Sequence, residues 1–232
     1  MIKAVFLGGL GVIAESSEQH RQAFNMVFQE LKLPIYWSLA EYQSMLHVPG
    51  GHQRIARYLN EHYPEHLYLT ETIHQLKGQY FQFLVKTNGV TLRPGVLSII
   101  QQANDLGIPV IVASTTQVKD INAVLLNSQI DMNSLARVFS EEDVSFNKPA
   151  PEIYKYACKV EQLTPEHCIA IEDSGAGVES AYAAGVPCYA FPGENTKDHN
   201  YEYAINKLST LDEIDLISGY ALSQEKSQIS AV

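Results

Sequence analysis

Three short polar segments of the chain contain side chains that could hold an anion or a metal ion. They are, in chain order, Ser114 with Thr115, Lys148, and Glu172 with Asp173. Hydroxyl and backbone N–H groups at the start of a helix bind phosphate, a lysine adds positive charge, and neighbouring carboxylates are hard oxygen ligands that suit Mg²⁺. Each segment alone also fits an ordinary turn. The three together favour a ligand site if the fold brings them to one place.

The elements that must position these residues follow from the hydrophobic periodicity. Strands are expected at 2–7, 109–113, 137–139, 168–171 and 187–191, and helices at 96–106, 118–128, 151–163 and 177–184. Continuous apolar strands that alternate with helices are typical of an α/β fold with a parallel sheet covered on both faces. Ligands of such sheets bind at the carboxyl ends of the strands, where the polar segments stand.

The stretch between the first two strands has a different character. Helical periodicity is expected at 17–33, 38–46, 52–63 and 70–86, with no convincing strand between residues 15 and 88. The pattern predicts an all-helical cap at 15–88, inserted into a core made of 1–14 and 89–222. Residues 223–232 form a polar tail without periodicity.

Composition excludes several classes of protein. The 232 residues carry a formal charge of -10 and a pI of about 5.2, which argues against nucleic acid or an anionic membrane as the main partner. A small phosphorylated ligand stays compatible with that charge, because a local site can be positive. Three cysteines without metal-type spacing, no long apolar run and no signal-peptide pattern lead us to expect a cytoplasmic protein.

Taken together, several motifs resemble the haloacid dehalogenase superfamily, in the branch that contains β-phosphoglucomutase and the CbbY sugar-bisphosphate phosphatases. The matching segments are Leu92–Arg93–Pro94–Gly95, Ala113–Ser114–Thr115, Lys148–Pro149, Ile171–Glu172–Asp173–Ser174 and, in the helical stretch, His20, Gly50–Gly51 and Arg54. The resemblance implies a Rossmann-like, doubly wound core with an inserted all-helical cap. It also implies phosphoryl-transfer chemistry on small phosphorylated sugars.

The resemblance assigns a role to each matched residue. Ser114, Thr115 and Lys148 match the groups that hold the transferring phosphoryl oxygens, and Glu172 and Asp173 match acidic residues that help to bind Mg²⁺.

The cap contributes a second set of matched positions. His20 is implied to lie beside the cleft, while Gly50, Gly51 and Arg54 belong to the substrate-facing part of the cap. A guanidinium fork suits a distal phosphate, so Arg54 is a candidate for that contact, although an exposed helix arginine is nearly as compatible with the pattern.

The match fails where the family's reaction begins. The family uses an Asp-x-Asp motif after the first strand, in which one aspartate attacks phosphorus and the other is the general acid and base. Here Gly8 and Leu10 stand at those positions, and the chain has no aspartate before Asp105. The site would carry a formal charge of -1 from Lys148, Glu172 and Asp173, against -3 in the family, so we expect Mg²⁺ to bind weakly or not at all.

The leading hypothesis is therefore a protein that has the family's fold and a phosphate or sugar-phosphate pocket but lacks normal phosphatase catalysis. One alternative is an active Mg²⁺-dependent phosphatase that uses direct water attack, with Glu172 or Asp173 as the base. A second is a regulatory or protein-interaction module, for which the sequence names no partner. A third is dinucleotide binding at Gly9-x-Gly11-x-x-Ala14, which would require a second parallel strand soon after the first helix.

Overall fold

The computed structural model describes residues 1–48 and 50–217, so the tail expected at 223–232 lies outside the described residues. Its centre is a five-stranded parallel sheet in the order β3-β2-β1-β4-β5. The strands are β1 (Ala4–Leu7), β2 (Val110–Ala113), β3 (Arg137–Phe139), β4 (Cys168–Glu172) and β5 (Cys188–Ala190). The expected α/β class with a parallel sheet is confirmed.

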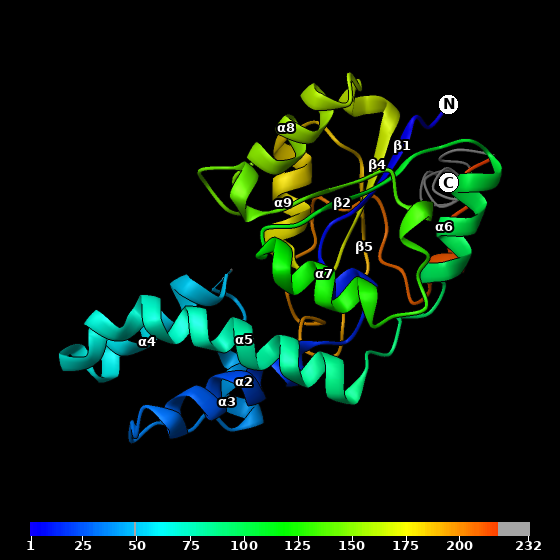
Figure 1. Ribbon diagram of the computed structural model, residues 1–232. Helices are drawn as coiled ribbons and strands as arrows, with labels where there is room; N and C mark the ends of the chain where they lie inside the picture. The colour runs from blue at the N-terminus through cyan, green and yellow to red at the C-terminus, as the bar shows by residue number, and fades with distance from the viewer. Residues whose placement is uncertain (49, 218–232) are drawn as a thin grey trace, which may run out of the picture.

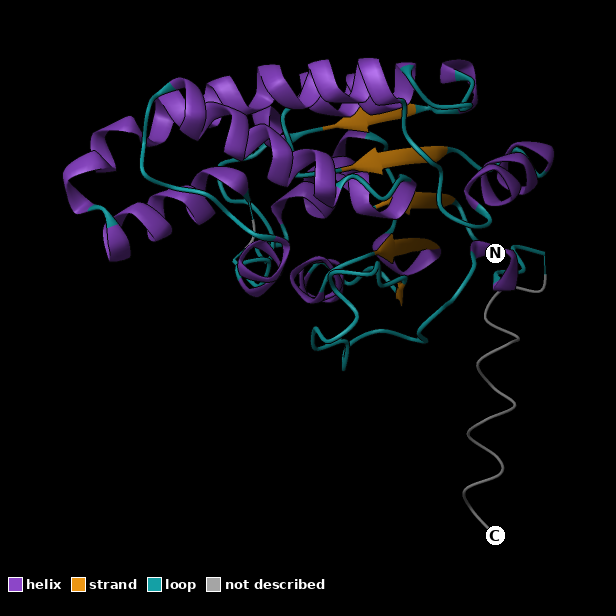
Figure 2. Cartoon of the chain, turned by 90° about the horizontal axis from the view of Figure 1, so that it is seen from below, coloured by secondary structure: helices purple, strands orange, loops and turns teal. Residues whose placement is uncertain are grey.

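Helices surround the sheet and extend beyond one of its edges (Figures 1 and 2). In chain order they are α1 (Leu10–Ile13), α2 (Ser17–Glu30), α3 (Leu39–Ser44), α4 (Gly51–His62), α5 (Thr70–Asn88), α6 (Val96–Asp105), α7 (Val118–Leu126), α8 (Glu152–Val160) and α9 (Gly175–Ala183). Short 3-10 turns lie at Pro64–Leu69, Met132–Ser134, Glu141–Asp143, Pro165–His167 and Leu211–Glu213. The elements follow the sequence expectation: β1, β2 and β5 are one or two residues shorter than expected, β3 has the expected bounds, and β4 is one residue longer, while the short helix α1 was not expected.

The central strand β1 shows why this sequence forms a sheet covered on both faces. All four of its residues are fully buried. Val5 and Leu7 pack on the side of α6 and α7, whereas Ala4 and Phe6 pack on the side of α8 and α9. Successive side chains of a strand point to opposite faces, so a strand that is apolar throughout must be buried on both.

Helices α2 to α5 form a separate layer with its own apolar core, and we call these helices the cap. Trp37, Phe24 and Phe28 lie at the centre of that core, and all three side chains are fully buried. Within residues 15–48 and 50–88 the structure contains no strand. The chain boundaries of the cap stay a sequence prediction, but the all-helical nature of this stretch agrees with its periodicity.

The cap and the core meet at the two chain crossings and along helix α5. Ala14 and Leu92, at the two crossings between cap and core, pair in an antiparallel bridge, and α5 packs against α7. In Figure 2 the arrowheads of the strands, which mark their carboxyl ends, point toward the cap. The cap therefore covers the edge of the sheet at which ligands of such folds bind.

Two functional classes considered from the sequence, dinucleotide binding and a membrane-spanning protein, can be compared with the fold. Among the described residues, no second strand follows β1 until Val110, so the glycines after β1 do not belong to the compact strand-helix-strand unit that the dinucleotide fingerprint requires. Among the described residues, no helix combines the length and the apolar character needed to span a bilayer.

The turn before α6 gives a first prediction. Gly95 has a φ of +81°, and a Cβ there would lie 2.6 Å from the backbone nitrogen of Asp212. Gly95→Ala should therefore destabilise the fold by more than the roughly 1–2 kcal/mol that a left-handed backbone costs a side chain. Gly107, with a φ of +67° and nothing within 4 Å of its missing Cβ, provides the matched control. Urea denaturation should show a larger loss for Gly95→Ala than for Gly107→Ala; equal losses would contradict the packing argument.

Candidate functional site

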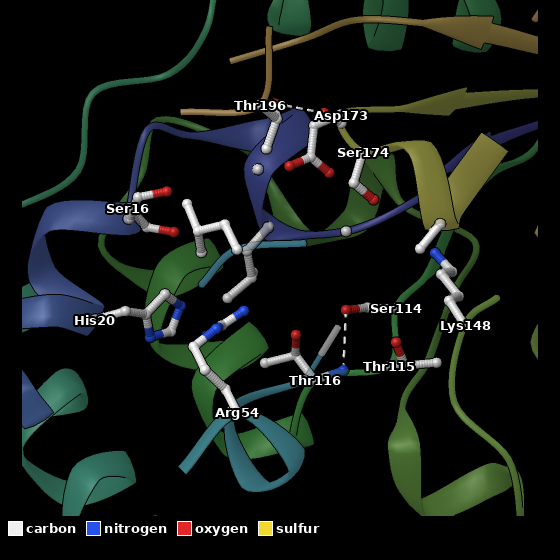
Figure 3. A pocket seen from close by; sticks show the side chains of 18 of the residues that line it. Ser16, His20, Arg54, Ser114, Thr115, Thr116, Lys148, Asp173, Ser174 and Thr196 are labelled. Atoms are coloured by element: carbon white, nitrogen blue, oxygen red, sulfur yellow. Dashed lines mark hydrogen bonds between the residues drawn. The ribbon is translucent and has the colours of Figure 1, made fainter. Parts of the chain in front are cut away.

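A cavity of about 230 Å³ lies between the cap and the carboxyl ends of the strands. Every candidate residue from the sequence lines it: Gly8, Leu10, His20, Gly50, Gly51, Arg54, Ser114, Thr115, Lys148, Glu172 and Asp173. Figure 3 shows Arg54 and His20 on the cap side, Ser114 to Thr116 on one core wall, and Asp173, Ser174 and Thr196 on the opposite wall. The fold thus brings the three polar segments and the cap residues to one place, while their roles stay predictions.

The loop after β1 brings no carboxylate to this cavity. Gly8 follows the strand directly, and Leu10 begins α1 with its side chain 4% exposed. The space beside Gly8 is occupied by the carboxyl group of Glu172, which a Cβ on Gly8 would overlap. A Cβ on Gly177 would overlap the same carboxyl group from the other side. Glu172 thus lies in the volume that a side chain at position 8 would need.

Lys148 and Glu172 form a closed, buried ion pair. The Lys148 Nζ lies 2.6 Å from Glu172 Oε1, and the two residues are 6% and 1% exposed. Lys148 also donates to the backbone oxygens of Ala113, at 2.8 Å, and of Gly8. The Tyr154 hydroxyl donates to the same Glu172 oxygen. A lysine ammonium has three N–H groups, and all three have protein acceptors here.

Burial shifts the protonation of both carboxylates. Removal from water raises the pKa of Glu172 to about 7, against the opposing effect of the Lys148 charge. Burial also raises the pKa of Asp173, and the positive charge of Arg93 partly offsets that effect. The Asp173 side chain lies against Gly11, and its backbone oxygen accepts hydrogen bonds from Thr196 and Tyr201 at 2.6 and 2.7 Å.

The donor set at these positions does not fit Mg²⁺, the ion that the resemblance implies. Glu172 is turned toward Lys148 and Tyr154, and Gly8 supplies no carboxylate. Mg²⁺ requires an octahedral set of hard oxygen ligands, usually with one or two carboxylates free to coordinate it. Within residues 1–48 and 50–217, no three His, Cys, Asp or Glu side chains are grouped to hold a metal.

The wall formed by Ser114, Thr115 and Thr116 presents hydroxyl groups. Ser114 is 1% exposed, and its Oγ accepts a hydrogen bond from the Thr116 N–H at 3.2 Å, as Figure 3 shows. The segment follows β2, whose last residue Ala113 pairs with Phe139 of β3. This wall can donate and accept hydrogen bonds but carries no charge, and the charge of its neighbour Lys148 is already paired.

On the cap side, Arg54 is buried but has no carboxylate partner among the described residues. Its Nε and Nη2 donate to the backbone oxygens of Met45 and Val48 at 3.2 and 3.0 Å, and its Nη1 lies 3.4 Å from the Tyr42 hydroxyl. Carbonyl groups fix its position without neutralising its charge. Arg54 is thus a cation that an anionic ligand could pair with.

His20 stacks on Phe81 with ring centroids 3.8 Å apart. Burial holds its pKa well below the ordinary value, and the nearby Lys77 and Arg54 charges act in the same direction. Its Nδ1 atom is buried and has no hydrogen-bond partner in the part of the chain that the structure describes. The expected place of His20 beside the cleft agrees with the structure.

Sequence reasoning missed a second buried ion pair in the cavity wall. Lys77 of α5 and Asp120 of α7 lie 3.1 Å apart, and Gln82 donates to the other Asp120 oxygen at 2.9 Å. The available signal was Lys77 itself, which stands on the apolar face of its helix, four residues after Ile73 and four before Phe81. A charge at such a position indicates a buried partner.

Comparisons with known proteins agree with this arrangement. A model of the haloacid dehalogenase-like hydrolases matches residues 2–185. The chain is 32% identical over 230 residues to Protein CbbY of Cereibacter sphaeroides, covering 96% of this chain and 98% of that relative. Among solved structures it is similar to CbbY from Rhodobacter sphaeroides in complex with phosphate, with 31% identity, a TM-score of 0.84, and 92% and 96% of the two chains covered. A β-phosphoglucomutase from Clostridium difficile, 20% identical with a TM-score of 0.78 over 98% and 100% of the two chains, shares the fold.

Proposed function

We propose that this chain, which belongs to the haloacid dehalogenase-like hydrolase family, binds a small phosphorylated molecule between cap and core without hydrolysing it at a normal enzymatic rate. The observation that carries this proposal is the loop after β1. Gly8 has no side chain, Leu10 is apolar, and the carboxylate nearest to the vacant position is held by Lys148. The cavity is retained, whereas the two groups that would attack and protonate a phosphate ester are missing.

The expected loss of catalysis is large. Removal of a covalent nucleophile costs on the order of a million-fold in turnover, and a positioned general acid or base contributes about 10²–10⁴-fold. These effects are not additive, because the two groups act in one reaction. A turnover on the order of a million-fold below that of an enzyme with both groups is therefore the expectation for the unmodified chain.

Binding has more support than catalysis. On the cap side the cavity presents the Arg54 guanidinium, which has no carboxylate partner among the described residues, and on the core side it presents the hydroxyl groups of Ser114 and Thr115. A phosphorylated sugar or similar polyol phosphate combines an anionic group with several hydroxyl groups, which is the chemistry these two sides can pair with. CbbY from Rhodobacter sphaeroides, which is similar over nearly the whole chain, was solved in complex with phosphate.

Direct water attack, with Glu172 or Asp173 as the base, has one supporting feature, the raised pKa values of both groups. The geometry argues against it. Glu172 Oε1 accepts hydrogen bonds from Lys148 and Tyr154, and Asp173 lies on the wall opposite the hydroxyl groups (Figure 3). Glu172 is thus engaged by Lys148, and Asp173 would have to act from across the cavity.

A thermal-shift experiment tests the binding proposal. A hexose monophosphate at a hundred times its Kd should stabilise the folded chain by about 2.7 kcal/mol, seen as a higher Tm. Arg54→Gln should abolish most of that shift, because it removes the unpaired cation of the cavity. Arg57→Gln is the matched control, since Arg57 lies on the same helix but pairs with Glu61 at the surface.

Two outcomes would contradict the proposal. One is no change in Tm with any sugar phosphate at millimolar concentration, which would favour the regulatory or protein-interaction alternative. The other is an equal loss of the shift in Arg54→Gln and Arg57→Gln, which would mean that the ligand binds outside the cavity.

A further inference from the structure

The carboxyl group of Glu172 occupies a space that exists only because two neighbouring residues are glycines. It lies between Gly8 of the loop after β1 and Gly177 of α9, and a Cβ on either residue would overlap it. Glu172 is the last residue of β4, where it pairs with Ala190 of β5, and the preceding Ile171 pairs with Leu7 of β1. The side chain therefore lies at the core end of the cavity, between the loop after β1 and α9.

In this position Glu172 pairs with the ammonium group of Lys148, which would otherwise be available to bind a phosphate. Lys148 donates one N–H to Glu172, one to Ala113 and one to Gly8, so it has none left for a ligand. Tyr154 adds a further donor to Glu172 and is itself fully buried. An anion could reach Lys148 only by displacing Glu172 from all of these contacts.

Displacement would leave an unpaired carboxylate in a buried site. Glu172 is 1% exposed, and Asp173 is next to it in the chain and also carries a carboxylate into the cavity wall. A phosphate placed at Lys148 would thus stand beside two carboxylates, and like charges at short range in a buried site repel strongly. The donor set described above offers no metal site that would offset this repulsion.

We propose that Glu172 is an internal anion that excludes phosphate from the core end of the cavity. This inference rests on the proposed function and specifies the orientation of its ligand. The phosphoryl group lies at the cap end, and an uncharged, hydroxyl-bearing end faces Ser114, Thr115 and Thr116. Lys148, matched by resemblance to a phosphoryl-binding lysine, is then a structural residue in this chain.

The test compares inorganic phosphate binding to three forms of the full chain by calorimetry, at a pH well above the Glu172 pKa of about 7 so that this carboxyl group is ionised. Glu172→Gln keeps the size and the acceptor oxygen but removes the charge, so it should bind phosphate at least about tenfold more tightly than the unmodified chain, because a hydrogen bond to a charged group is worth that much or more. Asp173→Asn is the matched control: it removes a carboxylate of the same cavity but frees no N–H group of Lys148, so its gain in phosphate affinity should be clearly smaller than that of Glu172→Gln.

Two results of this comparison would overturn the proposal. If the unmodified chain binds phosphate as tightly as Glu172→Gln, Glu172 excludes nothing. If Asp173→Asn gains as much affinity as Glu172→Gln, the effect is one of total charge and not of Lys148.

A measurement on the unmodified chain covers the case in which Glu172→Gln does not fold. A hexose bisphosphate should bind no more than about twofold more tightly than the matching hexose monophosphate, because a second phosphoryl group finds no cation at the core end. A gain of tenfold or more would overturn the inference. If neither sugar phosphate binds while Glu172→Gln gains affinity for inorganic phosphate, the proposed function fails and the role of Glu172 stands.

Discussion

Aspartate at both positions of the loop after β1, introduced as Gly8→Asp with Leu10→Asp, should raise phosphatase activity by at least about a thousandfold over the unmodified chain. The expectation rests on the size of what is missing, since loss of a nucleophile costs on the order of a million-fold. Sugar phosphates would be assayed with added Mg²⁺. The other groups matched by resemblance, Ser114, Lys148 and Asp173, already surround the cavity.

The structure specifies how the first of these substitutions acts. A side chain at position 8 would overlap the Glu172 carboxyl group, so Gly8→Asp must push Glu172 away from Lys148. The new aspartate can then pair with Lys148, whose Nζ already contacts the backbone oxygen of Gly8. Glu172 would turn toward the cavity and become free to coordinate a metal. Gly8→Ala causes the same overlap without a replacement carboxylate, and should leave Lys148 unpaired and the fold less stable.

An isosteric control separates charge from shape. Gly8→Asn with Leu10→Asn introduces side chains of nearly the same volume that can neither attack phosphorus nor shuttle a proton, so it should show no gain in turnover. Hydrolysis by the unmodified chain at a normal enzymatic rate, abolished by Lys148→Ala, would overturn the view that catalysis is lost. So would equal activities of the Asp and Asn double variants.

Much of this site was predictable from the sequence because strand ends in a parallel sheet share one edge. Ser114 and Asp173 follow β2 and β4, which both pair with β1, and their approach depends only on sheet topology. The absence of aspartates at positions 8 and 10 was equally predictable, because it follows directly from the identity of the residues there. The cap residues His20 and Arg54 needed the family resemblance, because no periodicity places a helix over a particular strand.

The contacts between side chains were not predictable in the same way. By resemblance, Glu172 was expected to help bind a metal ion. In the structure its carboxyl group instead forms an ion pair with Lys148, in space that Gly8 and Gly177 leave open. That outcome depends on a small space left open by the absence of side chains at Gly8 and Gly177, and a sequence motif does not describe such a space. The Lys77–Asp120 pair was missed for a related reason: its residues are 43 positions apart, and they meet only because α5 packs on α7.

Asp120→Ala should destabilise the fold by about 3–5 kcal/mol, because it leaves the Lys77 ammonium buried without a counter-charge. The side chains of Lys77 and Asp120 are 6% and 2% exposed, and burial already lowers the pKa of Lys77 while Asp120 opposes that effect. Gln82 would lose its acceptor as well. Urea denaturation measures the loss. Arg57→Ala, which breaks an exposed pair on α4, should cause no comparable change.

The position of this pair makes the experiment informative about the cap as well as about stability. Trp37 is the chain's one tryptophan and lies in the apolar core of the cap, so its fluorescence reports cap unfolding, while far-ultraviolet circular dichroism reports the whole chain. If Lys77–Asp120 couples the cap to the core, the two transitions should coincide in the unmodified chain and separate in Asp120→Ala. Lys77→Met with Asp120→Leu should recover most of the stability, because apolar residues of similar volume can replace a buried ion pair. A loss below about 1 kcal/mol in Asp120→Ala, or coincident transitions in that variant, would show that the packing of α5 on α7 holds the cap without this pair.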